Sequence, residues 1–326
     1  MRQPASRAWL WLGAKAAVSI ALLVYLLLRV DWPQTVRVVR QANTVMIGVA
    51  PLFYLGALWL GAARWRLVLA DSGIHYSGGQ AYRAYLVGQL YNILLPGAIG
   101  GDLVRIGMCA KSTACSVPEA TASVLLERAS GMIALLAFLV CVTLLPSFGN
   151  ALSGSELAIP LIRGVALGTG AALILLVAGR RALAGWVLRR PTTRVWRPIQ
   201  LAVRLLSNVR WTTLAAVLFL AALFQMCDIA ASYVLSRAIG LELPFATFFL
   251  VMPIVYLATA LPISLGGLGV REGTLTLLLS QFGVDPSDAI LLAFLFYLSR
   301  VCIAALGGLV QLFGGPSSGG RPWVRS

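Results

Sequence analysis

Six stretches of this 326-residue chain are long and apolar enough to cross a lipid bilayer, which takes about 20 helical residues. Because a backbone in hydrocarbon must satisfy its own hydrogen bonds, each stretch is expected to be a helix. Apolar residues make up 59% of the sequence, charged residues 11%, and the mean hydropathy is +0.87, which excludes a soluble globular domain. The sequence therefore predicts an all-α polytopic membrane protein, with spans at 9–30, 44–60, 121–145, 157–179, 211–235 and 286–312.

Two short segments between these spans carry the same proline and glycine pattern. Residues 95–107 read LPGAIGGDLVRIG, and residues 261–273, which begin 166 positions later (261 minus 95), read LPISLGGLGVREG. They share Leu, Pro, Gly, Gly, Val, Arg and Gly in register, and the same shift superimposes the span at 44–60 on the span at 211–235. This internal repeat predicts two halves, at about residues 9–147 and 157–312.

Each repeated segment is expected to interrupt a helix, because proline removes a backbone donor and glycine admits other conformations. If 81–115 and 243–282 are re-entrant hairpins, both termini, Arg64 and the basic loop 180–210 lie together on the cytoplasmic side, as the positive-inside rule requires. Two full crossings would instead place the terminal arginines outside. The prediction is about six full spans plus two Gly/Pro-broken, re-entrant helical hairpins, arranged as an inverted repeat.

The basic loop 180–210 contains eight arginines and no acidic residue, in a chain with a net charge of +15. In a membrane protein such a loop first indicates orientation, and second an attraction to anionic headgroups. The basic residues form no folded basic domain, so nucleic acid is not an expected partner.

The repeated segments are also candidate binding sites. Helix N-termini near Gly101 and Gly267 would present free N–H groups and positive partial charge, which suit an anion. Arg105 and Arg271 occupy matched positions, and a guanidinium can bind phosphate bidentately. Gly/Pro-interrupted segments at corresponding places in two halves are typical of a transporter site. The alternative is that the glycines serve close helix packing and the arginines extend to the membrane interface.

Further charged residues fall deep inside the predicted spans. Glu127 and Arg128 lie roughly 13 Å into a span that begins near Pro118, at about 1.5 Å per residue. Asp228 and Arg300 are similarly deep. Because an uncompensated charge is costly there, we expect either ion pairs, Glu127 or Asp228 with Arg300, or a polar path for a headgroup or a proton.

Three motifs in order, NILLPGAIGGDLVR at 92–105, ERASG at 127–131 and LPISLGGLGVREG at 261–273, resemble the flippase-like transmembrane domain of the lysylphosphatidylglycerol synthase family. In the multiple peptide resistance factors of that family, this domain moves aminoacylated phosphatidylglycerol between leaflets, and a separate soluble domain performs aminoacyl transfer. The resemblance implies a stand-alone member, with one transmembrane flippase-like domain at 1–314 and a tail at 315–326, and it implies lipid translocation without lysyl transfer.

The expected site combines residues that match the family motifs with the deep charges of the spans. It comprises Asn92, Pro96, Gly100, Gly101, Asp102, Arg105, Glu127, Arg128, Asp228, Gly266, Gly267, Arg271, Glu272 and Arg300.

The resemblance implies lipid translocation in a bacterial inner (plasma) membrane but does not choose the cargo. The matched arginines favour a phosphate-bearing lipid, which could be a phospholipid, a glycolipid or a polyprenyl-phosphate lipid. The positive-inside rule favours cytoplasmic termini. No metal or cofactor is expected, since the sequence holds one histidine, His75, and no CxxC, HExxH or GxSxG motif. The alternatives are an integral-membrane lipid-synthesis enzyme, which lacks a recognisable catalytic motif here, or a partner subunit of such an enzyme that docks through the basic loop.

Overall fold

The computed structural model describes residues 30–95, 100–113, 115–144, 178–191, 196–260 and 267–313, with residues 17, 20–22, 24–28, 164–165, 167–172, 175 and 264. Within these residues the secondary structure is helical and contains no strand. By length and composition, four of the described helices can cross a membrane, namely α3 (Thr44–Asp71), α6 (Val117–Thr143), α11 (Trp211–Ala238) and α14 (Pro286–Phe313). The chain is therefore an all-α, multi-pass membrane protein.

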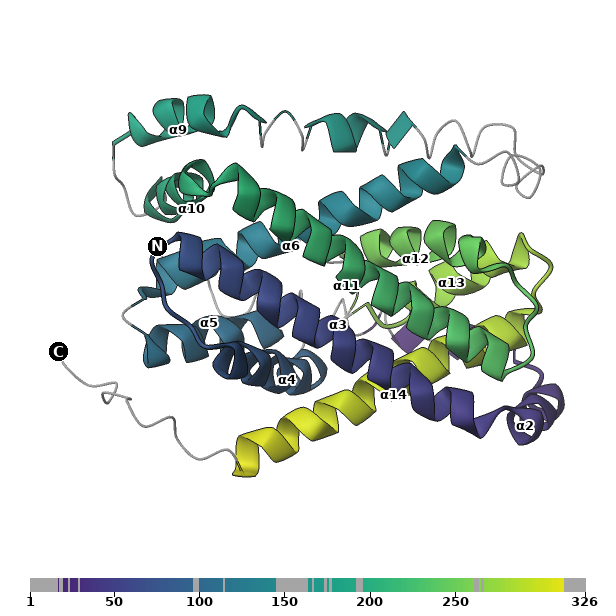
Figure 1. Cartoon of the computed structure of the whole chain (residues 1–326). Helices are drawn as coiled ribbons and strands as arrows, with labels where there is room; N and C mark the ends of the chain where they lie inside the picture. Colours follow the sequence, from purple (N-terminus) through teal and green to yellow (C-terminus); the bar gives the residue numbers. More distant parts are fainter. Residues whose placement is uncertain are drawn as a thin grey trace.

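Shorter helices connect these four (Figure 1). They are α2 (Trp32–Gln41), α4 (Gly78–Leu94), α5 (Gly100–Ser112), α9 (Arg180–Leu188), α10 (Trp196–Asn208), α12 (Phe245–Ala260) and α13 (Val270–Ser280). Capping residues determine where some of the helices begin. Ser77 and Gln80 form a capping box at the start of α4, and Ser116 and Glu119 form one at the start of α6.

The basic segment 180–210 was expected to be a loop, but it includes the helices α9 and α10. Helix α10 packs on α6.

Helices α3 and α11 lie side by side and run antiparallel (Figure 1). The Asn43 N–H, at the start of α3, donates to the Ala238 carbonyl at the end of α11 (2.8 Å). The Arg210 N–H, at the start of α11, donates to the Asp71 carboxylate at the end of α3 (2.7 Å). Both ends of the pair are therefore tied by hydrogen bonds.

The order α3, α4, α5, α6 is followed in the second half by α11, α12, α13, α14. Their first residues lie 167, 167, 170 and 169 positions apart (211−44, 245−78, 270−100, 286−117). The packing is reciprocal as well, since α4 packs on α14 while α12 packs on α6, and α6 packs on α11 while α14 packs on α3. The inverted repeat and the count of six spans stay predictions, because most of the predicted spans at 9–30 and 157–179 lies outside the described residues.

Each half places two short helices together where a broken hairpin was expected. Helices α4 and α5 pack so closely that a Cβ on Gly101 would lie 2.3 Å from the Gly88 carbonyl oxygen. Helices α12 and α13 also pack together, and the turn before α13 needs glycine at Gly267 and Gly269, whose φ angles are +79° and +81°. The breaks themselves, including Pro96 and Gly266, lie outside the described residues. Re-entry into the membrane stays a prediction.

The hydrophobic core lies among α3, α4, α11, α12 and α14. Its largest fully buried side chains include Trp65, Leu69, Phe248 and Leu292. Helices α4 and α14 approach so closely that a Cβ on Gly307 would lie 2.0 Å from the Leu86 carbonyl oxygen. The core thus holds elements of both halves around one centre, where the charged side chains described next are found.

Candidate functional site

A buried ion-pair network, which we call the N-terminal network, joins α3, α5 and α6. Glu127 is 4% exposed and accepts hydrogen bonds from Arg64 on one oxygen and from Arg105 on the other. Asp102 Oδ1 lies 3.3 Å from Arg105 Nη1, and its second oxygen pairs with Arg128. Both carboxylates are thus shared between two arginines, which is the arrangement that a buried charge requires.

Arg105 also contacts two aromatic rings besides its carboxylate partners. Its guanidinium carbon lies 3.7 Å from the centroid of the Tyr85 ring and 4.6 Å from that of Trp65. The Gly101 N–H at the start of α5 donates to Asn92 Oδ1 (2.8 Å), so a donor expected to bind an anion is taken by the protein. In this conformation Arg105 and the start of α5 are committed to internal contacts.

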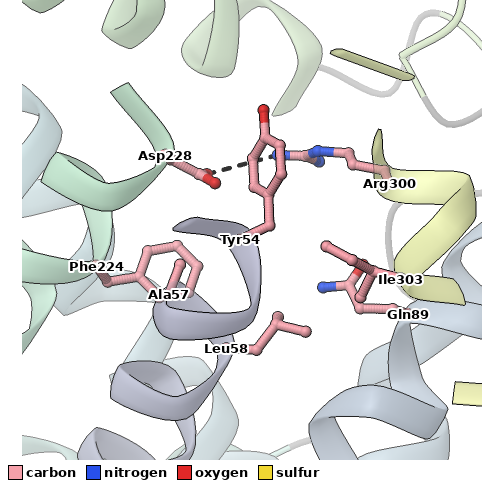
Figure 2. A pocket seen from close by; sticks show the side chains of 8 residues that line it. All are labelled: Tyr54, Ala57, Leu58, Gln89, Phe224, Asp228, Arg300 and Ile303. Carbon is pink, nitrogen blue, oxygen red and sulfur yellow. Dashed lines mark hydrogen bonds and ion pairs between the residues drawn. The ribbon is translucent and has the colours of Figure 1, made fainter. Parts of the chain in front are cut away.

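A second charged pair lies between the halves, near the middle of two 28-residue helices. Asp228 of α11 and Arg300 of α14 are joined at 3.5 Å, and their side chains are 7% and 34% exposed (Figure 2). The Arg300 guanidinium also lies 4.7 Å from the Phe296 ring centroid and 5.7 Å from that of Tyr54. The carboxylate is buried, whereas its cation is accessible.

The Asp228–Arg300 pair borders a cavity of about 30 Å³. Figure 2 shows the residues that line it, which are Tyr54, Ala57, Leu58, Gln89, Phe224, Asp228, Arg300 and Ile303. A bound water needs roughly 10–15 Å³ and several polar partners, so this cavity has room for one or two waters. In this conformation the cavity is too small for a lipid headgroup.

Arg271, at the start of α13, lies near the same aromatic ring, Phe296, as Arg300. It is 7% exposed, and its Nε makes no hydrogen bond; the nearby Glu272 Oε1 is 3.5 Å away. Glu272 accepts the Gly269 N–H (2.6 Å) and so caps its own helix. Arg271 lies 5.7 Å from the Phe296 centroid, so the guanidinium carbons of Arg271 and Arg300 are at most 10.4 Å apart (5.7 + 4.7). Both guanidinium groups thus lie near the same ring.

The two halves share one arrangement. On each of the corresponding helices α6 and α14, a partly exposed arginine pairs with a buried aspartate on another helix. Arg128 is 47% exposed beside Asp102 at 10%, and Arg300 is 34% exposed beside Asp228 at 7%. The arrangements differ in one respect, because Asp102 also contacts Arg105 whereas Asp228 has an ion pair with Arg300 alone among the described residues.

The structure resolves which of the expected ion pairs form. Of the two proposed partners for Arg300, Asp228 is the observed one, and Glu127 pairs with Arg64 and Arg105. Arg64 was expected with the cytoplasmic charges beyond a span ending at residue 60, but α3 continues to Asp71 and buries Arg64 to 4% exposure. An arginine in a mainly apolar segment, LGAARWRLVL, was the signal that could have placed it inside.

Of the remaining expected residues, some lie in contacts between helices and others lie outside the described residues. Gly100 and Gly101 are buried in the contact of α5 with α4, and Gly267 lies against Thr259 at the turn before α13. Pro96 and Gly266 lie outside the described residues. Sequence reasoning missed the aromatic residues around the arginines, Tyr54, Trp65 and Tyr85. Among the described residues, no cluster of His, Cys, Asp or Glu could hold a metal ion.

The sequence of the chain matches the model of a known protein family. Among curated proteins, none matches the chain. The family model described as the lysylphosphatidylglycerol synthase TM region matches residues 13–308, which include the helices that form both ion-pair clusters. The expected family is therefore confirmed, and the chain belongs to the lysylphosphatidylglycerol synthase transmembrane-region family.

Proposed function

We propose that this protein moves a phosphate-bearing lipid between the leaflets of an inner membrane. The headgroup would cross along the polar residues between the two halves, while the acyl chains remain in the bilayer. The observation that carries the proposal is the accessible Arg300 beside the buried Asp228 near the middle of two membrane-crossing helices. Ionisable side chains at such depth are costly, and they typically mark a substrate or ion path.

The second half offers the chemistry that a phosphate monoanion or phosphodiester requires. Arg300 is one-third exposed. The guanidinium carbon of Arg271, whose buried Nε makes no hydrogen bond, lies at most 10.4 Å from that of Arg300. Guanidinium groups bind phosphate oxygens through charge-assisted, often bidentate, hydrogen bonds. The Nε of the corresponding Arg105 also makes no hydrogen bond, but its guanidinium is already paired with two carboxylates and contacts two rings. We therefore assign the headgroup to Arg300 and Arg271.

We further propose that the two halves form an inverted repeat that exposes this site to each leaflet in turn. The antiparallel α3 and α11 and the reciprocal packing of the other helices support the proposal, because inverted repeats place corresponding helices in opposite directions around a central site. The eight arginines of 180–210 support cytoplasmic termini through the positive-inside rule. The proposal assigns transport and no chemical reaction to the protein.

Leaflet exchange of a fluorescent phosphatidylglycerol in proteoliposomes tests this function. The full chain is reconstituted, and quenching of the outer leaflet by dithionite reports how fast the inner lipids appear outside. We expect exchange by the wild type and at least a tenfold slower rate for Arg300→Ala, since a hydrogen bond to a charged group is worth about 1.5–3 kcal/mol and 1.36 kcal/mol is tenfold. Arg204→Ala, on the exposed side of α10, is the matched control and keeps the wild-type rate.

A slow rate caused by misfolding must be distinguished from one caused by loss of the guanidinium that binds phosphate. Arg300→Ala leaves Asp228 without its cation, so the double variant Asp228→Asn/Arg300→Gln, which removes both charges together, is assayed beside it. We expect the double variant to elute as the wild type does and to exchange lipid slowly. Absence of exchange by the wild type with phosphatidylglycerol, phosphatidylethanolamine and a polyprenyl phosphate would contradict the proposal in favour of an enzyme or partner-subunit role.

A further inference from the structure

Asp228 depends on a single cation, and that cation is the group proposed to receive the lipid. The carboxylate is 7% exposed and has Arg300 at 3.5 Å as its ion-pair partner. The other polar groups around it are neutral hydroxyls and an amide, with Tyr54 from α3, Tyr256 from α12 and Gln89 from α4. Tyrosine hydroxyls and an amide can hydrogen-bond to a carboxylate, but they do not neutralise its charge.

The remaining charges near α11 are bound elsewhere. On α6, Glu127 pairs with α3 and α5, and Arg128 pairs with Asp102 of α5. On α13, Arg271 lies 5.7 Å from the Phe296 ring centroid, and its Nε is 3.5 Å from Glu272 Oε1. On α11 itself, the neighbouring Cys227 is a free thiol. Among the described residues, Arg300 is therefore the one cation in ion-pair contact with Asp228.

A phosphate that binds Arg300 would leave Asp228 as a buried carboxylate without its counter-ion. Removing one partner from a buried pair costs several kcal/mol, and a buried carboxyl avoids that cost by taking up a proton and becoming neutral. The proton is available from water, because the cavity beside the carboxylate has room for one or two waters. Proton uptake thus follows from charge balance at the site.

We propose that lipid binding at Arg300 is coupled to protonation of Asp228, so that the protein carries one proton with each lipid phosphate. This inference rests on the proposed function, and it names the proton as the ion that drives lipid transport. In the proton step, a proton from water bonds to an Asp228 carboxylate oxygen as phosphate displaces that oxygen from Arg300. The reverse exchange, in which Asp228 loses the proton and pairs with Arg300 again, releases the lipid.

The aspartate of the first half, Asp102, differs from Asp228 because it has a second cation. If phosphate bound Arg128, Asp102 would still have Arg105 at 3.3 Å, so that its charge would remain compensated. Asp102 therefore has no need of a proton when a ligand binds. The coupling is expected at Asp228 alone of these two aspartates, although each is buried beside a partly exposed arginine.

Binding of a soluble, short-chain phosphatidylglycerol to the full chain in neutral detergent tests the coupling. Its phosphodiester keeps one charge across neutral pH, so the probe itself does not titrate. Isothermal titration calorimetry in two buffers with different ionisation heats counts the protons taken up per lipid. We expect one proton, and an affinity that weakens by up to tenfold for each unit of pH increase over the range where free Asp228 is ionised.

Two variants assign the proton to its residue. Asp228→Asn imitates the neutral carboxyl, so it should bind the probe without proton uptake and without pH dependence. Asp102→Asn should keep the wild-type pH dependence, as should Glu242→Gln, which removes an exposed carboxylate from the loop before α12. If Asp228→Asn does not fold, the proton count of the wild type still tests the coupling, because uptake of no proton would overturn it.

The outcomes separate this inference from the proposed function. Binding and leaflet exchange by the wild type without proton uptake would overturn the coupling and leave lipid transport standing. Proton uptake that persists in folded Asp228→Asn would also overturn it, because another group would carry the proton. Failure of the wild type to bind or exchange the lipid at any pH would overturn the proposed function and the coupling with it.

Discussion

Substitution of Glu127 by glutamine tests whether the N-terminal network is a structural ion-pair cluster. Glu127 is 4% exposed and shares its two oxygens between Arg64 and Arg105. In Glu127→Gln, Arg105 keeps Asp102 at 3.3 Å, but Arg64 loses its only described carboxylate and keeps the Phe224 ring at 5.3 Å. Breaking a buried pair in this way costs about 3–5 kcal/mol, and we expect a loss of stability of that size.

Unfolding in mixed micelles with increasing sodium dodecyl sulfate, followed by circular dichroism, gives the free energies. The exposed control, Glu242→Gln, is expected to remain within about 0.5 kcal/mol of the wild type. Adding Arg64→Met to Glu127→Gln removes the uncompensated cation, so the double variant should be more stable than Glu127→Gln. A loss below about 1 kcal/mol for Glu127→Gln, the size measured for exposed pairs, would refute the assignment of a dry, structural network.

Two glycine substitutions test the helix contacts that position both clusters. Gly307→Ala should destabilise the protein by about 1–3 kcal/mol in the same unfolding assay, because its Cβ would lie 2.0 Å from the Leu86 carbonyl oxygen. Gly308→Ala, whose Cβ would meet no heavy atom closer than 3.8 Å, should stay near the wild type. Gly101→Ala should likewise be destabilised, since its Cβ would lie 2.3 Å from the Gly88 carbonyl oxygen. Equal stability of Gly307→Ala and Gly308→Ala would show that α4 and α14 are not in close contact.

Much of the helical framework could be predicted from apolar length alone, but its boundaries could not. The predicted span at 44–60 stops before Arg64, whereas α3 continues to Asp71. Hydropathy counts Arg64 as an exposed charge, because it has no information about Glu127, which lies 63 residues later in the sequence. At 121–145 the observed helix starts earlier, at Val117, where the Ser116–Glu119 capping box satisfies its first backbone donors.

The residues of the site were predicted more completely than their partners, because Asp228 was one of two partners proposed for Arg300 and the arginines that pair with Glu127 were not predicted. Depth in the spans and repetition of the motif are local signals, and they led to Asp228, Arg300, Arg105 and Arg271. Which arginine is enclosed and which is accessible depends on rings from other helices, as with Tyr85 over Arg105. Such contacts depend on how the helices pack. The sequence alone therefore does not show that Arg105 is enclosed in the first half whereas Arg300 is accessible in the second.

The most direct test of the account is the leaflet-exchange rate of fluorescent phosphatidylglycerol with Arg300→Lys beside the wild type. Lysine keeps the charge that Asp228 requires, but it lacks the planar fork that binds phosphate bidentately. The account predicts a variant that folds as the wild type does, and exchanges lipid at least tenfold more slowly. Wild-type exchange by folded Arg300→Lys would contradict the assignment of the lipid phosphate to the Arg300 guanidinium.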